Sequence, residues 1–536
     1  MRRTRIDGRR RGPGRARRVS GVALALAAGR SRARDSTRAA RAWWIAGAAV
    51  LMMAITVQPF RDPDVWWHLA LGRLIVEHGI PPHEPFSFLT AANPWIHQQW
   101  LYEVGLFRTF SAGSFGPGLA SLGMGAVAVM AIVVAALSVP RSARVSGTWL
   151  AFAMVLSGLV MGEVVGVRGQ VVTLLGTSIL LLVITRWREG SSRAVWVLPP
   201  TFLLWANLHA GFVVGLIVLA VALAAASPLA PNGRLARRPL LAAAIVSLGA
   251  TLVNPAGLAI YQYVGETFAN PTLTSAITEW LSPDFHNVWV RLFEAEVVLM
   301  VILWAIGGGP ARFDLLLAGV AVAATLQAQR NVSLYALIAA PQIAAYGVRA
   351  WRAHAQPRLV RAGVRAPRAL HPLAAATAVL AIGAAVAAGA VVPNITPSAT
   401  RAFEAARYPR GPANYVAAHL MGQRLYSIDT WGGYLAYRFP SDRMVFLYGE
   451  TGVFGDRDLQ LYEDVHLLAS NWTDVLRRYS ISHAVIPLHS QEASAFHAIG
   501  WTVACFDAAS DAVVMSAGSA TSPPPVLDAP AGAPRC

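Results

Sequence analysis

The sequence predicts a polytopic α-helical membrane protein of about 11 transmembrane helices, amino terminus inside, with a small extracytoplasmic α/β domain at its carboxyl end. Three observations predict this class. Of the 536 residues, 55% are hydrophobic and only 14% are charged, and the mean hydropathy is +0.46. Several apolar segments are long enough to cross a bilayer. The basic residues concentrate at the amino terminus and in the short segments between these apolar runs.

The net charge of +17 comes from basic residues that are all arginine. Nucleic-acid binding would be one reason for such a charge, but no aromatic–basic groove and no known nucleic-acid motif accompanies it. We therefore expect no nucleic-acid partner. Arginines in short loops are typical of the cytoplasmic side of a membrane protein. Residues 1–41 are expected to form a basic, disordered cytoplasmic tail against anionic lipid.

The transmembrane part is predicted to cover residues 42–393. The expected spans lie at about 43–58, 115–139, 148–164, 171–185, two within 195–225, 240–253, 292–306, 313–327, 332–348 and 373–392. With the amino terminus inside, the arginine-rich loops 140–147, 186–193, 230–238 and 349–371 become cytoplasmic. The first outer loop, 61–114, and a second long loop, 254–291, then lie outside.

Residues 394–516 change character and are predicted to form the extracytoplasmic domain. Short β-rich runs such as LYSID, MVFLY and HAVIPL alternate with helical patterns, which is typical of a small α/β domain with a largely parallel sheet. Residues 517–536 are rich in Pro and Ala, and we expect a disordered tail. Cys505 and Cys536 would lie where a disulfide is permitted, but two free thiols fit a cysteine at the chain end equally well.

The first outer loop gathers carboxylates, histidines and tryptophans. Asp62 and Asp64 precede a helical pattern at 65–78, where Asp62 suits an N-cap and Asp64 suits the positive helix end. Capping does not require two tryptophans and a histidine directly behind it. We expect this helix to lie flat at the membrane interface, with Trp66 and Trp67 in the headgroup layer and His68 at the mouth of the bundle.

Further polar residues are predicted on the same outer side. A second amphipathic helix at 97–110 carries His97 and Glu103. Arg168 and Arg330 stand at outer span ends, where arginine is disfavoured. They either grip a phosphate or pyrophosphate, snorkel to lipid headgroups, or balance the loop carboxylates. The predicted catalytic candidates are Asp64, Asp62 and Glu103. The predicted substrate or lipid-phosphate ligands are Arg168, Arg330, His68, His97, Asn207, His209, Glu279, Asp284 and His286.

Several stretches resemble a group of bacterial polytopic membrane proteins. They are DPDVWWHLALGRLI, GIPPHEPFSF, PWIHQQWLYEV, LWANLHAGFVVGL, NPAGLAIYQY, ITEWLSPDF, RNVSLYALIAAP and YSIDTWGGYLAYRFP, between about 42 and 450. This group is similar to the GT-C superfamily of integral-membrane glycosyltransferases, which includes protein O-mannosyltransferases, aminoarabinose transferases and oligosaccharyltransferases. One departure is the turn LYGET, where the group usually shows an Asp-Gly-Arg-like turn.

The resemblance implies sugar transfer from a polyprenyl-phosphate-linked donor to a glycan, lipid or protein acceptor, on the outer face of a bacterial inner (plasma) membrane. It also implies that an acidic residue of the first outer loop acts as base or holds a divalent metal such as Mg²⁺ or Mn²⁺. Asp62 and Asp64 match that role by position. Two other readings stay open. The helix break near 207–211 is also typical of a transporter or flippase for a lipid-linked or polar solute. A non-catalytic envelope assembly factor would instead bind a partner through its terminal domain.

Overall fold

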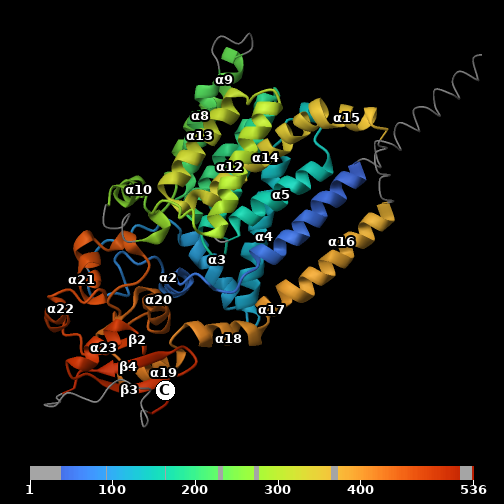
Figure 1. Ribbon diagram of the computed structural model, residues 1–536. Coiled ribbons are helices and arrows are strands. Elements are labelled where there is room, and N and C mark those ends of the chain that lie inside the picture. Colours follow the sequence, from blue (N-terminus) through green and yellow to red (C-terminus); the bar gives the residue numbers. More distant parts are fainter. Residues whose placement is uncertain are drawn as a thin grey trace, which may run out of the picture.

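The computed structural model describes residues 38–91, 93–162, 165–226, 233–270, 277–363, 372–518 and 534–536 (Figure 1). The tails predicted at 1–41 and 517–536 fall almost wholly outside these residues. The described chain is mostly helical, with a small sheet near its carboxyl end. This confirms the predicted class of a helical protein with several apolar helices and a small terminal sheet domain.

The amino-terminal part is a helical bundle with short connections. Its first described helix is Arg38–Thr56. In chain order the others are α2 (Asp64–His78), α3 (Trp100–Phe110), α4 (Gly116–Leu137), α5 (Gly147–Met161), α6 (Gln170–Arg188), α7 (Leu198–Leu208), α8 (Phe212–Ala225), α9 (Gly233–Ala250), α10 (Ala259–Ala269), α12 (Val288–Ile306), α13 (Arg312–Gln327), α14 (Val332–Ala350), α15 (Gln356–Arg361), α16 (Pro372–Val386) and α17 (Val392–Ile395). Short turns of 3₁₀-helix are η1 (Arg141–Ala143), η2 (Ser192–Val197), η3 (Thr278–Trp280) and η4 (Gln329–Asn331).

Membrane-crossing capacity can be judged from length and composition. Among the described residues, five helices are long and apolar enough to cross a membrane: Arg38–Thr56, Gly116–Leu137, Gln170–Arg188, Gln329–Arg361 and Ala374–Ile395. The predicted spans fall on helices, although α5 and α8 are apolar helices of shorter length. The chain is thus a membrane protein by its helices, while the predicted number of spans and their orientation stay predictions.

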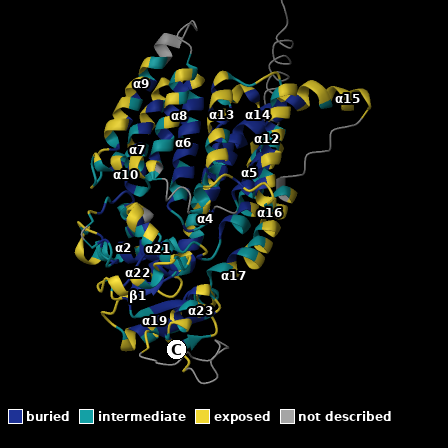
Figure 2. Ribbon diagram, turned by 60° about the vertical axis from the view of Figure 1, so that its left-hand side comes forward, coloured by how far each residue is buried: buried dark blue, intermediate teal, exposed yellow. Residues whose placement is uncertain are grey.

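Helix α14 is the centre of the bundle. All of its residues except Arg349 are buried, and it packs against α4, α5, α12 and α13. Gly347 allows the closest approach to α5, because a Cβ there would overlap the ring of Trp149. Figure 2 shows the contrast between the buried α14 and the exposed α16. Only 6% of the apolar window in Ala374–Ile395 is buried within the protein, so in a bilayer lipid would cover this helix.

The terminal domain combines helices with a four-stranded sheet. Its helices are α18 (Pro397–Arg407), α19 (Arg410–His419), α20 (Asp429–Arg438), α21 (Asp456–His466), α22 (Trp472–Arg478) and α23 (Gln491–Ala498). Its strands are β1 (Leu425–Ser427), β2 (His483–Pro487), β3 (Thr502–Asp507) and β4 (Ala512–Ser516), in the order β1-β2-β4-β3.

The prediction of a largely parallel sheet is wrong. Only β1 and β2 pair in parallel, whereas β2–β4 and β3–β4 are antiparallel. A short hairpin joins β3 to β4 and reverses the chain at Asp511, which has a positive φ of 53°. So short a connection cannot provide the crossover that parallel strands need. The predicted run MVFLY forms only isolated bridges, through Val445 to Ser87 and Leu425.

A disulfide joins Cys505 on β3 to Cys536 at the chain end. This resolves the alternative that the sequence left open, in favour of the bridge. The backbone around it pairs as well, since the N–H of Cys536 donates to the carbonyl of Phe506 at 3.0 Å. The last residues are therefore tied to the edge of the sheet.

The terminal domain packs directly on the first outer loop, at one end of the bundle (Figure 1). Trp66 of α2 lies 4.8 Å from Tyr434 and 5.1 Å from Tyr408, ring centroid to centroid, in edge-to-face contacts. Trp66 and Trp67 are only 2% and 3% exposed. Their predicted place in the headgroup layer is thus wrong, because aromatic side chains of the terminal domain cover Trp66.

Candidate active site

Asp62 and Asp64 lie at the amino-terminal end of α2. Oδ1 of Asp62 accepts the backbone N–H of Asp64 at 3.0 Å, as expected for a residue that caps the helix. Asp64 is in the first turn, where the helix dipole favours a negative charge. The helix ends at Gly79, whose φ of 86° is accessible to glycine at no steric cost, just before two prolines. The capping contact and the start of α2 therefore determine where both carboxylates lie.

Arg168, between α5 and α6, bridges two carboxylates from distant segments. Its Nε forms an ion pair with Oδ2 of Asp62, and its Nη2 lies 2.5 Å from Oε1 of Glu279 in η3. The side chain of Asp62 is 10% exposed and that of Arg168 is 22% exposed, so the pair is largely shielded from water. Of the three roles predicted for Arg168, the structure supports the one in which it balances the charge of outer-loop carboxylates.

The two aspartates differ in their partners. Burial raises the pKa of Asp62, while the charge of Arg168 opposes this rise. Burial also raises the pKa of Asp64 well above its usual range, and the negative charge of Asp62 raises it further. Asp64 forms no ion pair with any described residue. Asp62 is thus the carboxylate with a guanidinium partner, and Asp64 is the more basic carboxylate of the two.

Arg330 in η4 has a different environment from Arg168. Its guanidinium lies 4.5 Å from the ring centroid of Trp280, and it forms no ion pair among the residues that the structure describes. Its backbone carbonyl accepts from the side-chain amide of Gln170, which links η4 to the start of α6 at 3.0 Å. Arg330 therefore keeps its hydrogen-bond donors available to an anion.

His68 and Glu103 form a buried pair between α2 and α3, with His68 Nδ1 and Glu103 Oε1 3.3 Å apart. Burial lowers the pKa of His68 well below its usual value, and the positive charge of Arg168 adds to this. Burial raises the pKa of Glu103 well above its usual range, and the charge of Glu450 adds to this. Burial thus favours the neutral form of both groups, and the pair supports the wall of the site.

His209 follows α7, in the predicted helix break. The backbone N–H of Gly211 donates to its Nδ1 at 3.0 Å, and Thr173 Oγ1 lies 2.8 Å from the same nitrogen. The ring proton consequently lies on Nε2. Burial lowers the pKa of His209 to about 3, helped by the positive charges of Arg330 and Arg168. His209 is thus a neutral donor next to the two arginines.

Two other predicted ligands, Asn207 and His97, have partners within the protein. Asn207 accepts from Trp100 Nε1 and donates to the carbonyls of Leu203 and Val253, each at 2.8 Å. His97 Nε2 bonds to the carbonyl of Pro81 at 2.6 Å, and its ring stacks on Trp95. These two residues serve the packing of the loops.

Asp284 and His286 are the other predicted ligands that the structure does not bring to the cluster. Their side chains are 69% and 94% exposed, and they pair with each other at 3.0 Å. Among the residues of EWLSPDFH, only Glu279 reaches Arg168.

The terminal domain supplies two residues that were not among the predicted site residues. Gly449 lies so close to Asp64 that a Cβ at this position would overlap its Oδ1. Glu450, 5% exposed, accepts from the hydroxyl of Tyr263 at 3.2 Å, and Gln98 donates to the same hydroxyl at 3.0 Å. The signal available in the sequence was the departure LYGET, which places a glycine and a carboxylate in this turn.

The donor set does not fit a divalent metal at Asp62 and Asp64. The guanidinium of Arg168 already occupies the position from which a cation would neutralise Asp62 and Glu279. Within the described part of the chain, no three His, Cys, Asp or Glu groups lie close enough together to hold a metal ion.

The fold and this cluster define a polytopic membrane protein with a polar site at one end of its bundle, beneath a terminal domain. The fold resembles that of GT-C enzymes. The chain is similar to the archaeal oligosaccharyltransferase AglB from Archaeoglobus fulgidus, solved with an inhibitory peptide and a dolichol-phosphate. The TM-score is 0.50 at 12% identity, over 83% of this chain and 69% of that one.

Two further solved structures show lower similarity. ArnT from Cupriavidus metallidurans, in the apo state, has a TM-score of 0.47 at 14% identity, over 88% of this chain and 96% of that one. An Archaeoglobus fulgidus oligosaccharyltransferase in complex with Zn and sulfate has a TM-score of 0.45 at 13% identity, over 83% and 68%. The sequence matches no protein-family model and no curated protein.

Proposed function

We propose that this chain is a membrane-embedded glycosyltransferase. It moves a sugar from a polyprenyl-phosphate-linked donor to a glycan, lipid or protein acceptor on the extracytoplasmic face of a bacterial inner membrane. The observation that carries the proposal is the convergence of Asp64, Asp62, Arg168 and Arg330 from separate segments at one end of the bundle. The GT-C-like fold, similar to a structure solved with a dolichol-phosphate, supports it.

In this proposal Asp64 is the general base. Its carboxylate takes the proton of the acceptor hydroxyl, while the acceptor oxygen forms a bond to the anomeric carbon of the sugar. The raised pKa of Asp64 makes it a stronger base than an exposed aspartate. Asp62 and Arg168 hold the amino-terminal end of α2 in place, and the charge of Asp62 helps to keep Asp64 basic.

Arg330 acts on the leaving group. When the bond between the sugar and the lipid phosphate breaks, the phosphate oxygen keeps the electron pair, and the guanidinium stabilises that charge. Arg330 suits this role better than Arg168, because Arg168 is already paired with two carboxylates. His209, with its proton on Nε2, is a second donor near the same charge.

The test uses purified full-length protein in liposomes. Radiolabelled polyprenyl-phosphate hexose and pentose donors are offered singly, together with an extract of envelope glycans and lipids as acceptor. Wild-type protein is expected to transfer label out of the lipid-phosphate fraction. Asp64→Asn should lower the rate at least about 100-fold, which is the usual contribution of a general base.

The matched control is Glu77→Gln, since Glu77 lies on the same helix and pairs with Arg73 at the surface. It should transfer label at the wild-type rate. Undiminished transfer by Asp64→Asn would remove Asp64 from the mechanism. If the label crossed the bilayer on an unbroken donor, the protein would be a flippase and the proposal would be wrong.

A further inference from the structure

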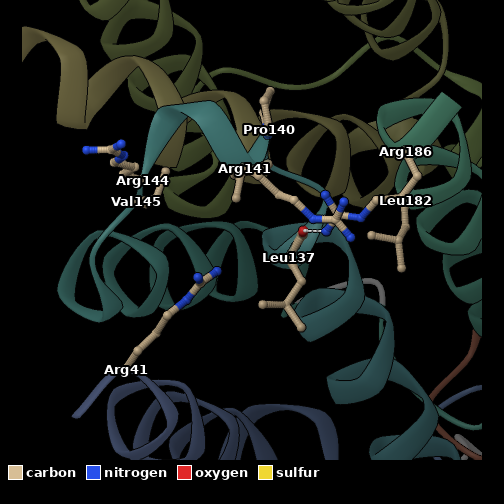
Figure 3. A pocket seen from close by; sticks show the side chains of 9 residues that line it. Arg41, Leu137, Pro140, Arg141, Arg144, Val145, Leu182 and Arg186 are labelled. Atoms are coloured by element: carbon tan, nitrogen blue, oxygen red, sulfur yellow. Dashed lines mark hydrogen bonds between the residues drawn. The ribbon is translucent and has the colours of Figure 1, made fainter. Parts of the chain in front are cut away.

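A cavity of about 360 Å³ lies at the other end of the bundle from Asp64. Four arginines line it: Arg41 from the first helix, Arg141 and Arg144 from the turn around η1, and Arg186 from the end of α6 (Figure 3). Leu137 and Leu182 contribute apolar lining. Arginines from three segments of the chain thus meet around one cavity.

This cavity is separate from the candidate active site. Gln170, at the start of α6, bonds to the carbonyl of Arg330 on the active-site side. Arg186 lies near the opposite end of the same helix, about 24 Å away by the rise of an α-helix. The proposed sugar transfer uses none of the arginines that line this cavity.

The positive charge of the cavity is only partly neutralised. Glu189 lies 2.9 Å from Arg186 Nη1 and 3.9 Å from Arg141 Nη1, and it also accepts the backbone N–H of Arg141. Arg41 and Arg144 form no ion pair with the described residues. Among the described residues, Glu189 thus offsets the charge of Arg141 and Arg186 and leaves that of Arg41 and Arg144.

The turn that carries two of these arginines is held in place. Arg144 has a positive φ of 47°, a conformation that a residue with a Cβ adopts at a steric cost. Arg352 donates to the carbonyls of Ala143 and Arg144 at 2.9 and 2.8 Å, which fixes the turn. Thr185 donates to the carbonyl of Ser138 at 2.9 Å and joins α6 to the same region. The arginines are thus presented by an ordered structure.

We propose that this cavity binds a phosphate group, as the headgroup phosphate of an anionic lipid or as a free phosphate compound. Guanidinium groups hold phosphate oxygens through paired hydrogen bonds, and the excess of positive charge favours an anion. The leucine side chains suit the apolar part of a lipid next to its headgroup. Basic pockets between membrane helices bind lipid headgroups in this way.

The experiment measures lipid retained by the purified full-length protein in neutral detergent, using native mass spectrometry. Phosphatidylglycerol is the anionic probe, and phosphatidylcholine is the zwitterionic comparison. Wild-type protein should retain phosphatidylglycerol in preference. The double variant Arg41→Gln/Arg144→Gln should bind it at least about tenfold more weakly, because it removes the two unpaired guanidinium groups.

The matched control is Arg193→Gln/Arg312→Gln. It removes the same charge from the same end of the bundle, at exposed positions that do not line the cavity. This control should retain the lipid as wild type does. Equal losses in both double variants would show a diffuse surface attraction and would overturn the proposal, as would an unchanged affinity of Arg41→Gln/Arg144→Gln.

Two further arms complete the test. Arg41→Gln alone should weaken binding with an unchanged size-exclusion profile, because this side chain bonds to no described residue; unchanged binding would contradict the proposal. Inorganic phosphate is then added as competitor. Displacement of the lipid assigns the site to a free phosphate compound, and retention assigns it to the lipid. If wild-type protein binds neither probe, the proposal is wrong.

Discussion

Glu450 offers a test of the contact between the terminal domain and the bundle that requires no substrate. This residue is 5% exposed, and its carboxyl group lies against Tyr263. Burial raises its pKa from 4.5 to about 7, although the hydrogen bonds from Tyr263 and Gln98 oppose the rise. Glu450→Gln keeps the shape and the acceptor oxygen of the side chain but cannot ionise.

The direction in which pH changes the free energy of unfolding follows from proton binding to Glu450. Between pH 4.5 and 7, folded wild-type protein holds a proton on Glu450 that the unfolded chain releases, so the free energy of unfolding falls as pH rises. A difference of about 2.5 pKa units corresponds to about 3 kcal/mol, fully lost above pH 8. Glu450→Gln should remove this loss and be more stable than wild type at pH 8.5.

The assay is denaturant unfolding in detergent micelles, followed by tryptophan fluorescence at pH 5 and at pH 8.5. The control is Asp442→Asn, which changes an exposed carboxylate of the same domain. It should follow the wild-type pH dependence. If wild-type protein and Glu450→Gln showed the same pH dependence of the unfolding free energy, Glu450 would not be buried against the bundle as described.

Three other predictions test particular contacts. Gly449→Ala should lower sugar transfer at least about tenfold, because its Cβ would displace Asp64, whereas Gly455→Ala, with nothing within 4 Å, should be active. Arg168→Gln should lower the free energy of unfolding by about 3 kcal/mol, since two carboxylates lose their counterion; a wild-type unfolding midpoint would contradict this. Cys505→Ser opens a loop of 31 residues and should cost about 3–4 kcal/mol, measured by unfolding with and without reductant.

The helices could be predicted from the sequence because their signal is local. Runs of apolar residues of sufficient length predict helices wherever they occur, and the break after Leu208 was visible as a polar interruption. The relative direction of the paired strands could not be predicted, because strand pairing depends on contacts between distant segments. The place of Trp66 was missed for the same reason, since Tyr408 and Tyr434 lie far along the chain.

The candidate site was partly predictable. The sequence indicates Arg168 because arginine is disfavoured at an outer span end, and Asp62 because it precedes a helical pattern in an outer loop. The structure pairs the two residues. Asp284 and His286 share a short motif with Glu279, yet nearness in sequence did not bring them to the cluster.

Some buried carboxyl groups are not among the predicted site residues, and one of them lies within an apolar helix. Glu296 in α12 is fully buried and accepts from the hydroxyl of Ser157 at 2.7 Å. Its signal was a glutamate within an apolar run, a combination that is costly in a membrane and therefore informative.

The contact between Gly449 and Asp64 also determines when the site can form. The two residues lie far apart in the sequence, and Asp64 is translated long before Gly449. Domains generally fold in the order of their synthesis, so the bundle assembles before the terminal domain docks. The neighbourhood of Asp64 is therefore completed last. A nascent or truncated chain that lacks Gly449 would therefore lack the completed surroundings of Asp64.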